Sequence, residues 1–482
     1  MDKGWFDQLD DRVGDGLEVV LRAQHRRRLH RVGWLGALAP APSERLWSSM
    51  VPVRGGNRVE VLIDGAEALP AIEDAIKAAE VSVHLGFWHA SPDFELSRGA
   101  DAQPLRDLLA ETAERVPVRL LLWAGPPLPA FQPTRRTVRA ARDEFERNSG
   151  VQCELDLRER TLHCHHEKIV VIDGSLAFVG GLDATSLQGD RYDDGIHEPR
   201  EALRWHDAAV RLRGPAAADV GRHFIQRWNE VAGEALPEPV IPAAEGDVEV
   251  QVVRTVPEHT YDFAPRGDFS VLESYVRALR SAERFIYLEN QFLWSPEIVD
   301  LLADKLQHPP SDNFRVVLLL PAKPSNGRDT TRGQLGRLID ADEEGTRLLA
   351  TTIIGIPGDD APPVYVHAKV GIVDDRWLTI GSANLNEHSL LNDTEVNVVM
   401  CDPTLARETR LRLWSEHTER PVEEVDGDPC DVIDQVWRPI AEEQARRAKA
   451  GMPPTHRLAE LPNLSKRMDR LEGPMRGLLV DG

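Results

Sequence analysis

One short pattern occurs twice in this chain, at corresponding places in its two halves. Both copies read His-x-Lys-x4-Asp, then six residues, then Gly-Gly or Gly-Ser. The second copy lies 201 positions after the first (367 − 166), and the offset is unchanged at the glycine pair (381 − 180). One His-x-Lys arises often by chance, whereas two at a fixed offset indicate an internal duplication. The copies comprise His166, Lys168, Asp173, Gly180 and Gly181, and His367, Lys369, Asp374, Gly381 and Ser382.

The duplication extends beyond the two motifs and predicts an α/β fold. In each half, strand-like apolar runs such as VPVRLLLW and FRVVLLLP alternate with helix-like stretches. This alternation favours a mostly buried sheet in each half, flanked by helices. A proline-rich stretch, residues 233–246, is the best linker candidate. The expected organisation is a helical preface (1–56), a first half (57–240), a second half (247–420) and a C-terminal extension (421–482).

Each motif is predicted to form a β-hairpin. IVVID and VGIVD read as strands, and turn-forming residues follow them. Side chains two positions apart on a strand share a face, so each histidine should project with its lysine. Asp173 and Asp374 are an odd number of residues from their histidines and close to the turn. They are expected to brace the hairpin more than to contact a substrate.

A carboxylate also recurs in the duplication. Asp207, in WHDAAVRLRGP, aligns with Glu395, in DTEVNVVMCDP, and each begins a strand-like run after the hairpin. A carboxylate that binds one imidazole nitrogen fixes the tautomer and raises the basicity of the other nitrogen. Each half therefore supplies a histidine and a carboxylate suited to pair with a histidine.

Composition narrows the possible functions. The formal charge is −22, which opposes nucleic-acid binding unless basic residues are gathered in a groove. No stretch approaches the ~18 consecutive apolar residues of a membrane span. The four cysteines lack a CxxC spacing, and the N-terminus lacks the pattern of a signal peptide. A cytoplasmic location is expected.

The preface allows two interpretations. Residues 17–32 have an apolar side and then become basic, from Arg26 to Arg31. The simpler interpretation is a helix packed on the domain with a solvated charged face. The alternative is a basic segment that makes a peripheral contact with the anionic inner face of a membrane.

Taken together, the paired motifs resemble those of the phospholipase D superfamily, often called the HKD family. The strand IYLENQF, the sequence Gly-Gly-Leu-Asp at 180–183 and the run WHD…GPAA resemble the eukaryote-like branch of that family. The resemblance covers about residues 57–414. It implies two halves related by a pseudo-two-fold axis, with both hairpins meeting at one active site, so that no oligomer is required.

The resemblance also implies roles for the residues. His166 would attack phosphorus to form a phosphohistidine, and His367 would act as general acid and base; the sequence itself leaves the reverse assignment open. Lys168 and Lys369 would neutralise the phosphodiester oxygens in place of a metal. Asp183 stands at the position that corresponds to Asn384 in the second half. This difference matters because an ionised carboxylate, unlike an amide, cannot donate a hydrogen bond to a phosphate oxygen. Further candidate contacts to the substrate are Ser382, Asn384, Gln291, Asn290 and Gly181.

The expected activity is hydrolysis of a glycerophospholipid, with transfer to an alcohol as a side or main reaction. Cardiolipin synthase-like transfer and nucleic-acid cleavage remain as alternatives, the latter disfavoured by the charge. We expect no cofactor and no metal, because neighbours in the run from His163 to His166 alternate faces of a strand and cannot all reach one ion. Three tryptophans could line a lipid site or belong to the core: Trp88, Trp205 and Trp294.

Overall fold

The structure is a computed structural model that describes most of the chain. The described residues are 5–40, 46–127, 132–158, 163–187, 189–192, 204–323, 328–355 and 364–462.

The two halves have the same strand order. In the first half the order across the sheet is β4-β3-β2-β5-β6-β8-β1, and in the second it is β13-β12-β11-β15-β16-β17-β9. Three parallel strands in each half are followed by antiparallel neighbours, so both sheets are mixed. The edge strands β1 and β9 pair antiparallel with each other and join the halves. The predicted duplicated α/β fold is confirmed.

The elements of the first half, in chain order, are β1 (Arg54–Ile63), α2 (Asp64–Lys77), β2 (Val83–Phe87), α3 (Leu105–Ala113), β3 (Val118–Trp123), α4 (Arg135–Glu146), β4 (Gln152–Asp156), β5 (Ile169–Ile172), β6 (Leu176–Gly180), β7 (Arg204–His206), β8 (Ala208–Arg213) and α5 (Ala217–Ala232). Those of the second half are β9 (Val248–Val256), β10 (Asp268–Phe269), α6 (Ser270–Ser281), β11 (Phe285–Glu289), α7 (Pro296–Gln307), β12 (Arg315–Leu319), α8 (Arg328–Ala341), β13 (Leu348–Ile353), β14 (Val364–Val366), β15 (Val370–Val373), β16 (Trp377–Gly381), the π-helical turn η2 (His388–Asn392), β17 (Glu395–Met400) and α9 (Pro403–Thr418).

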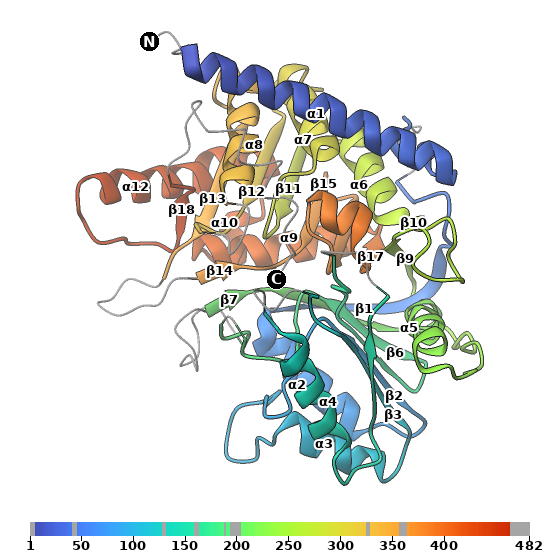
Figure 1. Ribbon diagram of the computed structural model, residues 1–482. Coiled ribbons are helices and arrows are strands. Elements are labelled where there is room, and N and C mark those ends of the chain that lie inside the picture. Colours follow the sequence, from blue (N-terminus) through green and yellow to red (C-terminus); the bar gives the residue numbers. More distant parts are fainter. Residues whose placement is uncertain are drawn as a thin grey trace.

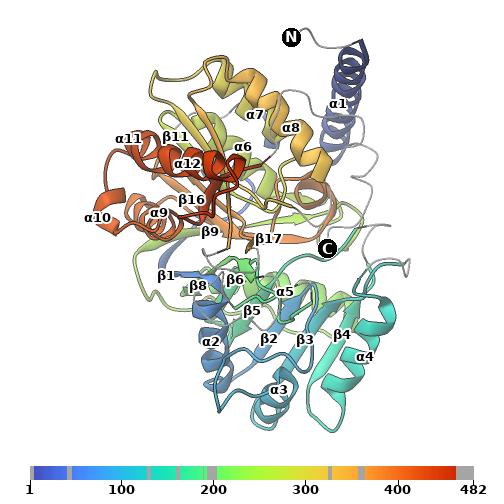
Figure 2. The same cartoon turned by 90° about the vertical axis from the view of Figure 1, so that its left-hand side faces the viewer.

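Helices cover the outer faces of both sheets. Helices α2, α3 and α4 lie at one end of the molecule and α6, α7 and α8 at the other, as Figures 1 and 2 show. Each set buries its apolar residues against its own sheet. The chain after α9 forms α10 (Val422–Val425), α11 (Pro429–Val432), the π-helical turn η3 (Ile433–Trp437), α12 (Arg438–Lys449) and β18 (Leu458–Glu460). Strand β18 pairs with β13 and extends the second sheet.

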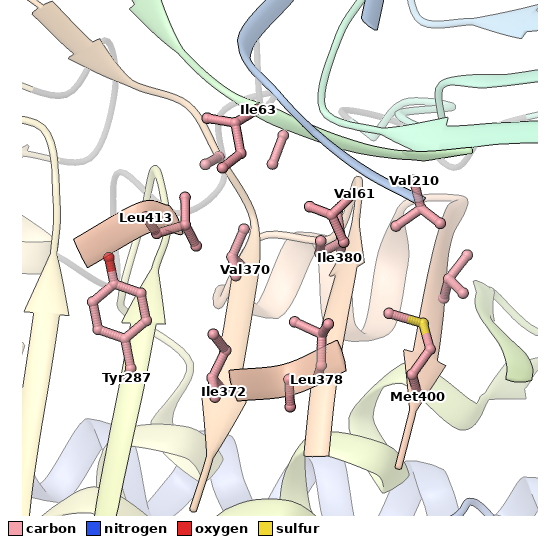
Figure 3. Close-up of a cluster of buried hydrophobic side chains, with 14 of the residues drawn as sticks. Val61, Ile63, Val210, Tyr287, Val370, Ile372, Leu378, Ile380, Met400 and Leu413 are labelled. Carbon is pink, nitrogen blue, oxygen red and sulfur yellow. The ribbon is translucent and has the colours of Figure 1, made fainter. Parts of the chain in front are cut away.

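A single hydrophobic core lies between the halves. Val61 and Val210 of the first half belong to the same buried cluster as Ile372, Ile380 and Met400 of the second (Figure 3). Burial of apolar surface contributes about 25 cal/mol per Å², so a core shared between the halves favours one fixed arrangement over two independent units. The site at their junction is therefore built on a rigid base.

The N-terminal helix α1 (Trp5–Val32) packs on the second half, where it crosses α6–α8 in Figure 1. It is followed by the short 3-10 helix η1 (Leu35–Leu38). Leu29 is buried and Arg28 pairs with Glu258, whereas Arg26 and Arg31 face solvent. The basic run is thus divided between an inward and an outward face, as the simpler interpretation predicts. No helix among the described residues is long and apolar enough to cross a membrane.

Candidate active site

The two motif histidines lie where the halves exchange backbone hydrogen bonds. The N–H of His166 donates to the carbonyl of Thr394 over 2.9 Å, and that of His367 donates to the carbonyl of His206 over 2.8 Å. Strands β7 and β14, which precede Asp207 and His367, form a separate two-stranded parallel sheet. Each histidine is therefore held beside the carboxylate-bearing strand of the opposite half.

The carboxylate contacts of the two histidines are crossed. His166 Nδ1 lies 3.0 Å from Glu395 Oε1, and His367 Nδ1 lies 2.7 Å from Asp207 Oδ2. An ionised carboxylate only accepts hydrogen bonds, so in a neutral ring the proton resides on Nδ1. This leaves Nε2 of each ring as the basic nitrogen. Each motif histidine thus pairs with a carboxylate of the opposite half.

The two motif lysines are buried in different surroundings. Lys168 Nζ lies 3.3 Å from Asp183 Oδ2, whereas Lys369 Nζ donates to the amide oxygen of Gln291 over 3.3 Å. Asn384, the counterpart of Asp183, also donates to that amide oxygen, over 3.4 Å. Lys168 Nζ thus faces a carboxylate, whereas Lys369 Nζ faces an amide oxygen.

Asp173 and Asp374 act on the backbone. Asp173 Oδ1 accepts from the N–H groups of Val81 and Ser82, and the Asp374 carboxylate accepts from those of Arg284 and Phe285. These amides lie at or just before the start of the strand that pairs with each hairpin. Both aspartates have a positive φ of 55°, which suits a tight hairpin turn. Their positions fit the bracing role, and we propose no direct catalytic role for either.

Two predicted contact residues lie against the carboxylates. Ser382 donates through Oγ to Glu395 Oε2, while a Cβ on its counterpart Gly181 would lie 2.1 Å from Asp207 Oδ1. Gly181 therefore makes room for Asp207, whereas Ser382 binds Glu395. Ser389 also donates to Glu395, through Oε1 over 2.5 Å. Contact of Ser382 with substrate stays a prediction.

Two of the predicted amide side chains, Asn290 and Gln291, have different partners. Asn290 accepts from the backbone N–H of Leu385 over 3.0 Å and orders a loop. Gln291 donates to the hydroxyl of Tyr365 over 2.9 Å while its oxygen binds Lys369. Gln291 thus accepts a hydrogen bond from the motif lysine Lys369 and links this lysine to Tyr365.

A buried arginine that the motifs did not reveal lies beside the site. Arg191 is 2% exposed, and its guanidinium carbon lies 3.8 Å from the centre of the Trp205 ring. The Trp205 ring lies 4.2 Å from that of His367, centre to centre. Nη2 of Arg191 donates to the carbonyl of Leu187, but Nε and Nη1 have no hydrogen-bond partner among the described residues. Unsatisfied buried guanidinium donors are rare and suit a ligand with several acceptors.

Burial and charge set the protonation of the site. Burial raises the pKa of Glu395 to about 8, although Lys168 and the hydroxyls of Ser382 and Ser389 oppose this shift. Burial also raises the pKa of Asp207, against the effect of Lys369. For His367, burial and then the cations Lys369 and Arg191 lower the pKa well below its usual value. Lys168 and His166 are weaker causes of the same shift.

We expect a pH profile that depends on Glu395. If His166 needs an ionised Glu395, then kcat/KM should rise with pH towards about 8, where Glu395 loses its proton. Replacing Ser382 by glycine, or Ser389 by alanine, removes a hydrogen bond to the carboxylate and should move the midpoint to higher pH. Steady-state rates from pH 5 to pH 9 measure the shift. An unchanged midpoint in both variants would mean that the ionisation of Glu395 does not control the rate. Ser415→Ala, near the end of α9, is the control, because it removes a serine hydrogen bond away from the site.

A second buried charge network supports the Asp207 side. His206 lies 2.9 Å from both Asp64 and Glu289, through its two ring nitrogens. Asp64 also accepts from the backbone N–H of Asp207 over 2.9 Å. Although burial opposes it, Asp64 and Glu289 raise the pKa of His206 well above its usual value. His206 is therefore an imidazolium held between two carboxylates, and it holds the chain next to Asp207 in place.

The fold and the crossed site define a protein of two duplicated α/β halves that share one histidine pair. A crystal structure of phosphatidylserine synthase from Haemophilus influenzae has the same fold, with a TM-score of 0.56 at 14% identity over 85% of this chain and 97% of that one. Residues 275–415 match a family model described as "Cardiolipin synthase, PLD-like domain".

Similar sequences come from eukaryotes. Phospholipase D1 of Schizosaccharomyces pombe is 25% identical over 76% of this chain and 34% of its own length. Phospholipase D zeta 2 of Arabidopsis thaliana is 24% identical over 83% of this chain and 57% of its own length. The chain is thus similar to phospholipase D proteins over most of its length. It spans about a third to just over half of the length of these two relatives.

Proposed function

We propose that the chain cleaves the phosphodiester bond of glycerophospholipids, releasing phosphatidic acid and a head-group alcohol. The observation that carries this proposal is the crossed arrangement of two histidine–carboxylate pairs, with a buried lysine beside each. Two imidazoles supplied by opposite halves suit in-line displacement at phosphorus, because nucleophile and leaving group must lie on opposite sides. The names of the relatives support a lipid substrate, and the net charge of −22 opposes a nucleic acid.

In the first step, Nε2 of His166 attacks phosphorus and the P–O bond to the head group breaks. The leaving oxygen takes a proton from His367. In the second step, His367 removes a proton from water, the oxygen of that water attacks phosphorus, and the P–N bond to His166 breaks. Phosphatidic acid leaves and both rings return to their starting states. An alcohol in place of water gives a new phosphodiester.

The low pKa of His367 in the free protein bears on its role as acid. Lys369, Arg191 and Lys168 are among the causes that lower it, after burial. A bound phosphodiester anion would offset these positive charges and raise the pKa of His367. Substrate binding therefore supplies the condition under which His367 holds a proton for the leaving oxygen.

The substrate class can be tested directly. The purified chain is incubated with phosphatidylcholine vesicles and, separately, with single-stranded DNA, with and without a primary alcohol. We expect choline release, phosphatidic acid and, with alcohol present, the phosphatidyl alcohol. DNA cleavage without lipid turnover would overturn the proposal. A product formed only in the presence of alcohol would favour the phosphatidyltransferase alternative.

The covalent intermediate is expected to reside on His166. An aryl phosphodiester whose leaving group needs no protonation should phosphorylate His367→Ala, in which breakdown is slow, and the adduct should survive alkali but not acid. Peptide mass spectrometry locates it. An adduct on His367 in the His166→Ala variant would reverse the two roles, and an acid-stable adduct would identify another nucleophile.

A further inference from the structure

A cluster of possible metal ligands lies beside the active site, across the junction of the halves. His163 Nδ1 lies 3.0 Å from His388 Nδ1 and 3.4 Å from Asp393 Oδ1. The ligand atoms of these three residues all lie within 4.8 Å of one another. His163 comes from the first half, just before His166, whereas His388 and Asp393 come from the second half, just before Glu395. None of the three belongs to the crossed pairs.

The chemistry of the cluster favours a cation at its centre. The Nδ1 atoms of His163 and His388 face each other, and two neutral rings can place only one proton between them. A single hydrogen bond is therefore the most that these two nitrogens can form with each other. Asp393 is fully buried, and its Oδ2 has no hydrogen-bond partner among the described residues. Two imidazoles and a carboxylate are a common ligand set for zinc.

The backbone holds these ligands in place. The N–H of Asp393 donates to the carbonyl of His388 over 2.8 Å and closes the π-helical turn η2, a feature frequent at functional sites. Asp393 Oδ1 accepts from the N–H of Cys164 over 2.9 Å, which ties the turn to the segment bearing His163. From α1, Arg28 donates to the side chain of Asn392 over 2.7 Å. The geometry is fixed by contacts that do not involve the ligand nitrogens.

The other histidine–carboxylate cluster shows the contrast. Both ring nitrogens of His206 are bound by carboxylates, Asp64 and Glu289, at 2.9 Å. A ring that donates from both nitrogens has no lone pair for a metal. His163, by comparison, has a side chain that is 19% exposed and leaves a path for an ion from solvent.

We propose that His163, His388 and Asp393 bind one zinc-type dication, with a solvent molecule completing four-fold coordination. The ion would join the two halves next to His166 and Glu395. This inference departs from the expectation of a metal-free chain, and it does so through ligands about 225 residues apart. Of the run His163–His166, a single residue takes part, since His165 contacts Asp156 and Thr394.

The experiment uses the full-length chain without an affinity tag, stripped with a chelator and titrated with Zn²⁺ by calorimetry. We expect one saturable equivalent, and affinity at least tenfold weaker in His163→Gln and in Asp393→Asn. The asparagine retains a carbonyl to accept from Cys164, and His163 is near the surface, so both variants should fold. His308→Ala, which removes an exposed histidine, and His367→Ala should bind zinc as the parent does.

Thermal unfolding provides the second measurement. Zinc should raise the unfolding midpoint of the parent chain, by mass action, and not that of His163→Gln. A parent chain without saturable zinc binding would overturn the proposal. Equal affinity in both ligand variants, or loss of binding in His367→Ala alone, would also overturn it, because the ion would then lie elsewhere. Neither measurement depends on the lipid activity.

Discussion

Replacing His166 or His367 by alanine is expected to lower turnover of a phosphodiester by about 10⁴-fold or more. His166→Ala removes the group that forms the bond to phosphorus, and His367→Ala removes the proton donor and acceptor. The rate with phosphatidylcholine vesicles measures the loss. The two effects should not add in the double variant, because one missing step already stops the cycle. A single variant with a near-normal rate would remove that histidine from the mechanism.

The carboxylates give this expectation a sharper form. Asp207→Asn and Glu395→Gln preserve shape but disturb the imidazole tautomer, at a cost of about 10²–10⁴ in rate. Because the pairs are crossed, Glu395→Gln should prevent formation of the adduct on His166. Asp207→Asn should instead slow its breakdown, so that the adduct accumulates with the activated aryl substrate. The opposite pattern would mean that each histidine depends on the carboxylate of its own half.

The duplicated motif was sufficient to predict the fold and the hairpins. In each motif a short apolar run lies between the His-x-Lys pair and a turn, and few local structures other than a hairpin fit this pattern. Asp173 and Asp374 do lie at turns, with positive φ. The crossed partners could not be predicted in this way. Spacing along the chain fixes which residues share a strand, but the contact of His166 with Glu395 depends on how two strands 229 residues apart meet.

Prediction was weaker for residues that act through others. Ser382 and Asn290 are predicted to contact the phosphate, and both stay predictions. In the structure the Ser382 hydroxyl donates to Glu395, and Asn290 accepts from the backbone N–H of Leu385. A polar residue beside a motif indicates proximity to the site and not the direction of its side chain. The repeat does not indicate the proposed zinc ligands, because His388 and Asp393 have no histidine or aspartate at the corresponding positions of the first half.

Arg191 was also missed, because it occupies no position of the repeat. Its charge is buried, and burial lowers its pKa to about 10, so it still carries its proton near neutrality. Two of its nitrogens have no hydrogen-bond partner among the described residues. Transfer of an unpaired charge from water is unfavourable, and the packed Trp205 ring offsets only part of that free energy. A phosphate oxygen would supply the missing acceptor, beside the ring of His367.

Arg191→Met should therefore lower kcat/KM by about 10²–10³, the loss typical of one group that stabilises transition-state charge. Arg191→Lys should recover part of it, since the charge returns without the planar fork. Arg410→Met is the matched control, because Arg410 is equally buried, lies 4.7 Å from the Trp414 ring and pairs with Asp375 at 2.8 Å. That variant breaks an ion pair and should lower the unfolding midpoint while leaving kcat/KM near the parent value. Arg191→Met should show the reverse, with lost activity and a midpoint that is unchanged or higher, because it removes a buried guanidinium whose Nε and Nη1 have no hydrogen-bond partner among the described residues. A lower midpoint with retained activity would make Arg191 a packing residue and place the phosphate nearer to Lys168.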